Sequence, residues 1–361
     1  MMKIGIWMTV VLCCALLWTE VGAALPRDLA EMLPEDAAAL LEEAEEDGGV
    51  PSLAEGLVRL WEKGLGMAEA IVRQSMGGAV LLLVAVLLCA LAEDCAAAAN
   101  NERVIRVAPA IGALVVTLTA AGDIRSLIGV GTQAMDELNV LSKALLPTLM
   151  AAVAAGGGAV SAGVRHVAAV FFSDLLISLI RVFLLPLVHI YMVTAAGEIL
   201  LPGRQLRRIS KAIAAGTTWT LRAVLIGYTG YLTLAGAAAT SADAMGVQVT
   251  QAAMGAVPVV GSIISDAAAT VMSGAAVLKS TIGIVGTIAV LSLCLAPFLR
   301  LGIQYLLYKM TAFLAGTLGS ESLVTLIDDL GRAFSLVLGM TGACATLLLI
   351  SMMTSILAVS R

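Results

Sequence analysis

The sequence predicts an all-α, polytopic membrane protein with about seven membrane segments, and both its composition and the form of its apolar runs indicate this class. Hydrophobic residues make up 60% of the 361 residues and charged residues only 13%, whereas a soluble chain carries about 25% charged residues. No globular core could bury that apolar excess, so we expect lipid to surround most of the chain. The apolar runs are continuous and do not alternate with polar residues, which excludes a transmembrane β-barrel.

The first 24 residues have the pattern of an N-terminal signal sequence. Lys3 precedes an apolar run at 4–18, and small residues follow at 21–24, as they do at a cleavage site for secreted proteins. The run is short for a membrane span. An uncleaved first membrane helix is the alternative interpretation. Cleavage would leave the residues that follow outside the cytoplasm.

Residues 25–75 form an acidic segment, with twelve acidic side chains against four basic ones, and we expect this segment to be non-cytoplasmic. Nucleic-acid binding requires a basic surface for the phosphates, so the composition argues against it. One helix is expected to start at Pro34, and Ser52 can cap a second, amphipathic helix after the break at 48–51. The segment is either a docking surface or a solvated stretch of modest structure.

Residues 76–361 are predicted to form a multi-helix membrane domain. Apolar runs lie at 77–91, 104–121, 144–164, 167–196, 212–239, 280–299 and 334–359. The run at 280–299 has the length of about 20 residues that crosses a hydrocarbon core. Tyr305, Tyr308 and Lys309 follow it as an aromatic and cationic collar, typical of a membrane interface. Amphipathic connectors are expected at 123–143 and 320–332.

The orientation of the runs is ambiguous from sequence. Lys and Arg favour the cytoplasmic side, which places the basic loop at 204–211 inside. Simple alternation from a non-cytoplasmic N-terminal segment sends the same loop outside. A re-entrant or two-part hairpin at 167–196, split at Pro186, would resolve the conflict, since irregular backbone is tolerated where it faces protein or water.

Five charged residues in or beside the apolar runs are the candidate intramembrane polar or assembly residues, namely Asp174, Arg181, Arg222, Asp266 and Lys279. Ionisable side chains inside a membrane are costly and therefore suggest function. Asp174 and Arg181 are seven residues apart and share a helix face, so they are poorly placed to pair with each other. Pairing with another helix is expected instead, with Arg222 as a candidate. A polar or ion-conducting track is one interpretation, and a buried charge pair that fixes helix register is the other.

No catalytic, cofactor or metal site is expected. The two histidines, His166 and His189, have no second ligand at metal-binding spacing, and the cysteines form no C-x-x-C pair. Ser161 lies near His166 but outside a G-x-S-x-G turn. The chain has no G-x-x-x-x-G-K-[ST] phosphate loop, so nucleotide-driven work would have to come from a partner.

One stretch carries a resemblance to a known family. The run AVPVVGSIISDAAATVMSGAAVLKSTIGIVG at 256–286, followed by CLAPFLRLGIQYLLYK at 294–309, resembles the stage III sporulation protein AE family. The order of leader, acidic segment and apolar runs agrees with that resemblance. It transfers a role to the chain but no active site.

The resemblance implies a membrane component of a multi-protein, secretion-like channel in endospore-forming bacteria. It also implies a location in the mother-cell membrane that surrounds the forespore. The implied partners are a cytoplasmic ATPase, ring-forming proteins, a forespore protein and other small membrane subunits. Small-residue repeats such as 227–230 and 339–342 permit close helix packing within the chain or in a homo-oligomer. A self-sufficient solute or ion transporter is the competing function, and a membrane enzyme would need a reactive constellation that the sequence lacks.

Overall fold

The chain is built entirely of long helices in the part that the structure describes. The structure is a computed structural model, and it describes residues 33–35, 37–39, 42, 52–99, 102–200, 204–255, 261–317 and 321–357. The predicted signal sequence at 1–24 lies outside these residues. Ser52 caps the first long helix as expected, because its hydroxyl accepts a hydrogen bond from the Glu55 amide at 3.4 Å.

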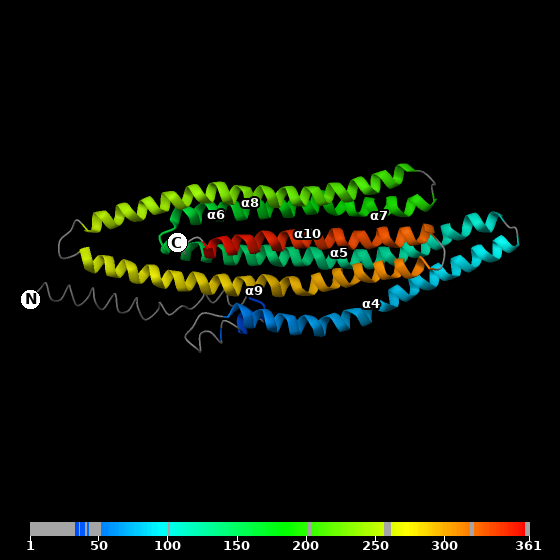
Figure 1. Cartoon of the computed structure of the whole chain (residues 1–361), viewed down its shortest axis with the longest axis horizontal. Helices are drawn as coiled ribbons and strands as arrows, with labels where there is room; N and C mark the ends of the chain where they lie inside the picture. The colour runs from blue at the N-terminus through cyan, green and yellow to red at the C-terminus, as the bar shows by residue number, and fades with distance from the viewer. Residues whose placement is uncertain are drawn as a thin grey trace, which may run out of the picture.

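The helices lie side by side along one long axis (Figure 1). They are α4 (Leu53–Ala98), α5 (Glu102–Ala155), α6 (Ala159–Leu179), the π-helical turn η1 (Ile180–Leu184), α7 (Leu185–Leu200), α8 (Arg204–Gly255), α9 (Gly261–Ala315) and α10 (Glu321–Leu357). The longest, α9, has 55 residues, which corresponds to about 80 Å at 1.5 Å per residue. That length exceeds a hydrocarbon core of about 30 Å, so α9 must tilt or extend beyond it.

Six helices of the described residues are long and apolar enough to cross a membrane, and the chain is a multi-pass membrane protein. The sequence suggested seven runs because it divided α5 into two spans and a connector. In the structure, the runs at 104–121 and 123–143 and the first part of 144–164 form one continuous helix. Arg125, Asp136 and Lys143 are exposed along one face of the helix, whereas Asp123 is hydrogen-bonded to α9. Ile124, Leu138 and Leu141 are buried in the core.

The third predicted run, 144–164, is wrong as a single span, because the chain turns within it. Helix α5 ends at Ala155, and α6 begins at Ala159 after three glycines. Gly157 has a φ of 92°, a backbone conformation that side chains with a Cβ rarely adopt. The Gly158 amide closes the turn by donating to the Val153 carbonyl at 3.0 Å.

The long run at 167–196 does not fold back on itself, so the expected re-entrant hairpin is wrong. Helices α6 and α7 continue each other through η1, and the candidate span covers Ala159–Ile199. The Leu185 amide donates to the Ile180 carbonyl, five residues earlier. This π-helical turn lies directly before Pro186, which has no amide donor, and it absorbs the local mismatch without breaking the helix.

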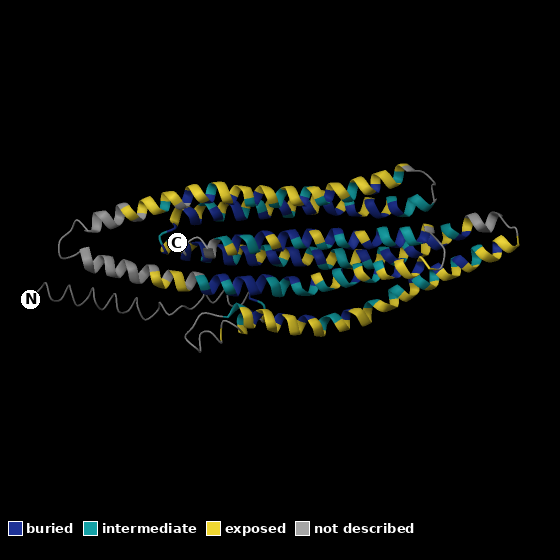
Figure 2. Cartoon of the chain, in the orientation of Figure 1, coloured by how far each residue is buried: buried dark blue, intermediate teal, exposed yellow. Residues whose placement is uncertain are grey.

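Helix α10 occupies the centre of the bundle and packs against α5, α6, α7, α8 and α9. Figure 2 shows α10 largely buried, whereas α4 and α8 have long exposed stretches. Phe334 is fully buried and its ring lies 4.9 Å from that of Tyr308. A Cβ on Gly131 would lie 2.9 Å from Val337, so α5 and α10 approach closely there.

The bundle has two ends with different chemistry (Figure 1). The connections after α4, α7 and α9 lie at one end, where α8 begins with Arg207, Arg208 and Lys211. The connections after α5 and α8 lie at the other end. With six helices instead of seven runs, simple alternation puts the start of α4 and the basic start of α8 on opposite sides.

Candidate functional site

A polar site on the exposed side of the bundle is built around an ion pair between Arg181 and Asp136. Arg181 lies in the π-helical turn η1, and Asp136 lies in the part of α5 that the sequence suggested as a connector. Both side chains remain accessible, at 49% and 53% of their full exposure. The pair therefore lies on the surface of the bundle and leaves both charges accessible to a further molecule.

Asp136 belongs to a polar stripe along one exposed face of α5. We call this face the α5 stripe; its exposed members are Arg125, Ser126, Gly129, Gln133, Asp136, Val140 and Lys143. Their spacing of mostly three or four residues places them on one side of the helix. The Gln133 amide donates to Glu137 at 2.9 Å. The stripe carries charges of both signs over 19 residues, from Arg125 to Lys143, which is about 27 Å of helix.

The α5 stripe lies at the same level as the apolar parts of α9 and α10. A Cβ on Gly131 would meet Val337 and Thr341 of α10. A Cβ on Gly286 of α9 would lie 3.2 Å from Leu145. These contacts set residues 131–145 of α5 beside the long uncharged stretches of α9 and α10, so the stripe runs through the depth that those helices occupy in the membrane.

The structure does not bring the predicted charged residues together as one track. Asp174 and Arg222 are both exposed, and no ion pair joins them within the described part of the chain. Arg181 pairs instead with Asp136 of α5. Asp266 and Lys279 lie on α9, and their side chains fall outside the described residues.

Arg222 instead lines a hollow of about 400 Å³ between α8 and α10. Thr218 on α8 and Ser335 and Thr346 on α10 supply hydroxyl groups to its wall. The hollow is open at the surface, and Leu221, Leu225 and Leu336 make much of the remaining wall apolar. The charge of Arg222 thus lies where a neighbouring chain or a lipid can reach it.

A second polar network joins α5 to α9. The Asp123 carboxylate accepts hydrogen bonds from the Gln304 amide and the Tyr308 hydroxyl, each at 2.9 Å. Tyr308 is only 1% exposed. Its expected place in an interfacial collar is therefore wrong, because its hydroxyl satisfies a carboxylate inside the bundle.

Asp243 of α8 holds the start of α6. Its two carboxylate oxygens accept hydrogen bonds from the amides of Val160 and Ser161, each at 2.8 Å. Gly158 precedes α6 and has no side chain to cap it, so the amides of its first turn need a partner from elsewhere. The glycines before α6 indicate from sequence that this helix has no capping side chain of its own. Nothing in the sequence identifies Asp243 as the residue that supplies the cap.

Arg165 of α6 is another charged residue that the sequence analysis missed. It is 8% exposed and donates to the Thr354 carbonyl of α10 at 2.6 Å. Among the described residues, no three His, Cys, Asp or Glu side chains gather as a metal-binding group. The contacts described for this site are ion pairs and hydrogen bonds between helices.

Comparison with known proteins gives one consistent result. The family model described as "Stage III sporulation protein AE" matches residues 55–360. A relative from Bacillus subtilis (strain 168), also called "Stage III sporulation protein AE", is 24% identical over 266 residues. The alignment covers 73% of this chain and 66% of the relative, just under two thirds of its length. No solved structure matches the chain.

Proposed function

The chain belongs to the stage III sporulation protein AE family, and from that membership we propose that it is a membrane component of a multi-protein, secretion-like channel between mother cell and forespore. Membership implies a role in sporulation. The proposed location is the mother-cell membrane that surrounds the forespore, where the channel is required for endospore development.

The α5 stripe is the observation that carries the channel proposal. Charged side chains at membrane depth are costly against lipid and almost always face protein or water. Asp136 and Arg181 are about half exposed although they pair with each other, and Lys143 is exposed on the same face. A second subunit or a water-filled passage beside α5 would satisfy these groups, whereas a chain working alone in lipid would leave them exposed to it.

The topology of six helices supports the same proposal. Counting from a non-cytoplasmic segment at 25–75, alternation places the basic start of α8 in the cytoplasm, in agreement with the preference of Lys and Arg. The acidic segment is then free to meet a partner outside the cytoplasm. This orientation removes the need for the re-entrant hairpin.

The proposed partners follow from what the chain lacks and from the family. The sequence holds no phosphate-binding loop of the G-x-x-x-x-G-K-[ST] type, so a cytoplasmic ATPase would supply the energy for export. Ring-forming proteins and other small membrane subunits complete the proposed channel. The α5 stripe is the surface on which we expect one of these subunits, or a second copy of the chain, to pack.

Photo-crosslinking in sporulating cells tests the channel proposal. A crosslinking amino acid at Gln133 or Val140 in the α5 stripe should give adducts with another protein subunit. The same group at Val193 or Leu234, which are 72% and 79% exposed apolar positions, is the matched lipid-facing control. The proposal would be contradicted if all four positions crosslinked only to lipid and with equal yield.

Two further outcomes separate the channel from its competitor. Deletion of the chain should block spore formation after engulfment, and normal sporulation would count against any role in the channel. A self-sufficient solute or ion transporter would move its substrate across liposomes with no other protein present. Such activity in the purified chain would favour that alternative.

A further inference from the structure

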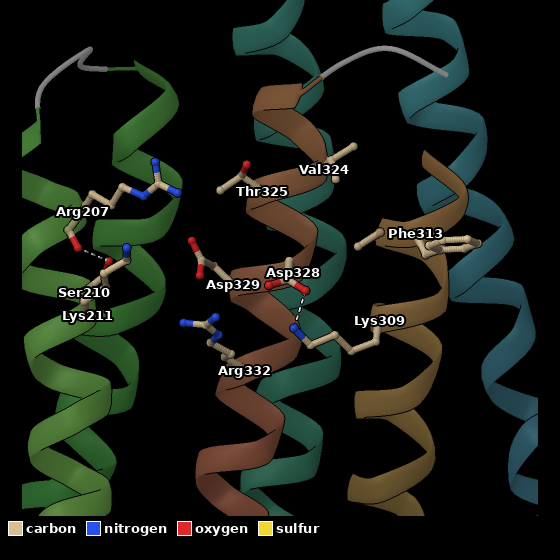
Figure 3. A pocket seen from close by; sticks show the side chains of 11 residues that line it. Arg207, Ser210, Lys211, Lys309, Phe313, Val324, Thr325, Asp328, Asp329 and Arg332 are labelled. Carbon is tan, nitrogen blue, oxygen red and sulfur yellow. Dashed lines mark hydrogen bonds and ion pairs between the residues drawn. The ribbon is translucent and has the colours of Figure 1, made fainter. Parts of the chain in front are cut away.

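A charged pocket lies at the basic end of the bundle, where α8, α9 and α10 meet (Figure 3). Its volume is about 420 Å³. We call it the cationic pocket; its charged members are Arg207, Lys211, Lys309, Asp328, Asp329 and Arg332. Three separate helices thus bring four cations and two carboxylates to one hollow.

Part of this charge is already used within the chain. Lys309 forms an ion pair with Asp328. Asp329 accepts a hydrogen bond from the Tyr191 hydroxyl at 3.3 Å, and the Arg207 guanidinium lies 3.7 Å from a Glu198 carboxylate oxygen. Each of these contacts gives a charged group of the pocket a partner within the chain.

Two cations remain available to a ligand. Lys211 of α8 and Arg332 of α10 are exposed and make no ion pair in the part of the chain that the structure describes. Figure 3 shows them on facing helices, with the Asp329 carboxylate nearby. With four cations against two carboxylates, the pocket has an excess of positive charge, which suits an anion.

The pocket lies where charged and apolar parts of the helices meet. Arg332 directly precedes the uncharged stretch 333–354 of α10, and Lys211 directly precedes 212–221 of α8. On α9, Phe313 lines the pocket and is 71% exposed, and Met310 and Leu314 are exposed beside it. A ligand here would meet cations directly beside the uncharged stretches that follow Lys211 and Arg332, as the headgroup of a phospholipid does at a membrane interface.

We propose that the cationic pocket binds the phosphate group of an anionic phospholipid. Lys211 and Arg332 contact the phosphate, and the acyl chains lie along the uncharged stretches 212–221 of α8 and 333–354 of α10. The excess positive charge makes phosphatidylglycerol a better ligand than the zwitterionic phosphatidylcholine. This proposal depends on the chain spanning a membrane and is independent of its role in a channel.

Lipid binding to the purified full-length chain in nanodiscs tests the proposal, with lipid retained on the protein counted by native mass spectrometry. Wild-type protein should retain phosphatidylglycerol in preference to phosphatidylcholine. The double variant Lys211→Gln/Arg332→Gln should bind phosphatidylglycerol on the order of 25-fold more weakly, at about fivefold for each cation lost. The matched control Arg208→Gln/Arg300→Gln removes two exposed cations that do not line the pocket and should change binding by less than about twofold.

A second variant tests the same charges in the opposite direction. Asp329→Asn removes a carboxylate from the pocket and should strengthen phosphatidylglycerol binding, so its result does not depend on whether the double variant folds.

Equal retention of the two lipids by the wild type would overturn the proposal. Equal loss of phosphatidylglycerol binding in the pocket variant and the control variant would also overturn it. Competition by soluble glycerol phosphate as effective as that by the lipid would assign the pocket to a free phosphate. Binding of an acidic peptide with no lipid preference would assign it to a protein partner.

Discussion

Arg181 and Asp136 form an ion pair between the π-helical turn η1 and helix α5, on the exposed side of the bundle. The sequence predicts a partner for Arg181 on another helix, and it predicts an amphipathic connector at 123–143, where Asp136 lies. The pair exists because α5 continues as a helix through that connector. The same continuation brings Lys143 and Gln133 to membrane depth.

Breaking the Arg181–Asp136 pair should impair assembly more than folding. Asp136→Asn or Arg181→Gln leaves one charge without its partner, and spore yield should fall in both variants. In detergent, where water reaches the half-exposed pair, the loss of unfolding free energy should stay below about 1 kcal/mol. Spore counts and thermal unfolding in detergent measure the two effects.

The reciprocal exchange Asp136→Arg/Arg181→Asp should restore part of the spore yield that either single variant loses.

Asp174→Ala, which changes an exposed intramembrane charge, should lower the spore yield. Changes at Glu43 or Glu45 in the acidic segment are the controls and should have less effect. If all these variants sporulate as well as the wild type, the intramembrane charges have no special role.

Asp243→Ala should loosen the turn between α5 and α6. The substitution removes both hydrogen-bond acceptors of the Val160 and Ser161 amides, and loss of a helix cap costs about 0.5–2 kcal/mol. Hydrogen exchange in the first turn of α6 should become faster. Asp243→Asn keeps one acceptor oxygen, so its exchange rate in this turn should lie between those of the wild type and the alanine variant. Unchanged exchange at Val160 and Ser161 in the alanine variant would refute the capping role.

Two glycines of α5 can distinguish packing within the chain from binding of other subunits. A Cβ on Gly131 would lie 2.9 Å from Val337, whereas a Cβ on Gly129 meets nothing within 4 Å. Gly131→Val should therefore destabilise the isolated chain by about 1–3 kcal/mol through overpacking.

Gly129→Val has the same helix propensity but should leave the stability of the isolated chain in detergent nearly unchanged. Because Gly129 lies in the α5 stripe, this variant should instead reduce co-purification of other subunits from sporulating cells. Thermal unfolding and pull-down yields distinguish the two. Equal destabilisation by both substitutions would show that Gly129 also packs within the chain.

Single cysteines test the six-helix topology. Ala99→Cys, Gln205→Cys and Thr317→Cys lie at the basic end of the bundle, and Ala159→Cys lies at the opposite end. In a background without the native cysteines, and with the chain expressed in the plasma membrane of non-sporulating cells, a membrane-impermeant thiol reagent added outside intact cells should label only the cysteine at 159. Labelling of the cysteine at 205 from outside would contradict the orientation expected from the basic start of α8.

Sequence reasoning identified the class of the molecule and several local features. The apolar run at 280–299 lies within one α9 span, and the Ser52 cap is confirmed by its hydrogen bond to Glu55. Sequence reasoning misread 123–143 because it weighed the charge of the segment without knowing which helix face each charge would occupy. It misread 167–196 because Pro186 can either break a helix or be absorbed by a π-helical turn, and no local pattern distinguishes the two.

The sequence by itself determined that lipid surrounds most of this chain, that the chain is helical, and that a few charges must lie among apolar residues. Those properties depend on the summed hydropathy of neighbouring residues, so they can be read locally. The tertiary structure alone decided that Arg181 meets Asp136, that Asp243 caps α6 from 82 residues away, and that Lys211 and Arg332 face one pocket. Such pairings depend on how distant helices pack, and the free energy of packing is not a property of any single segment.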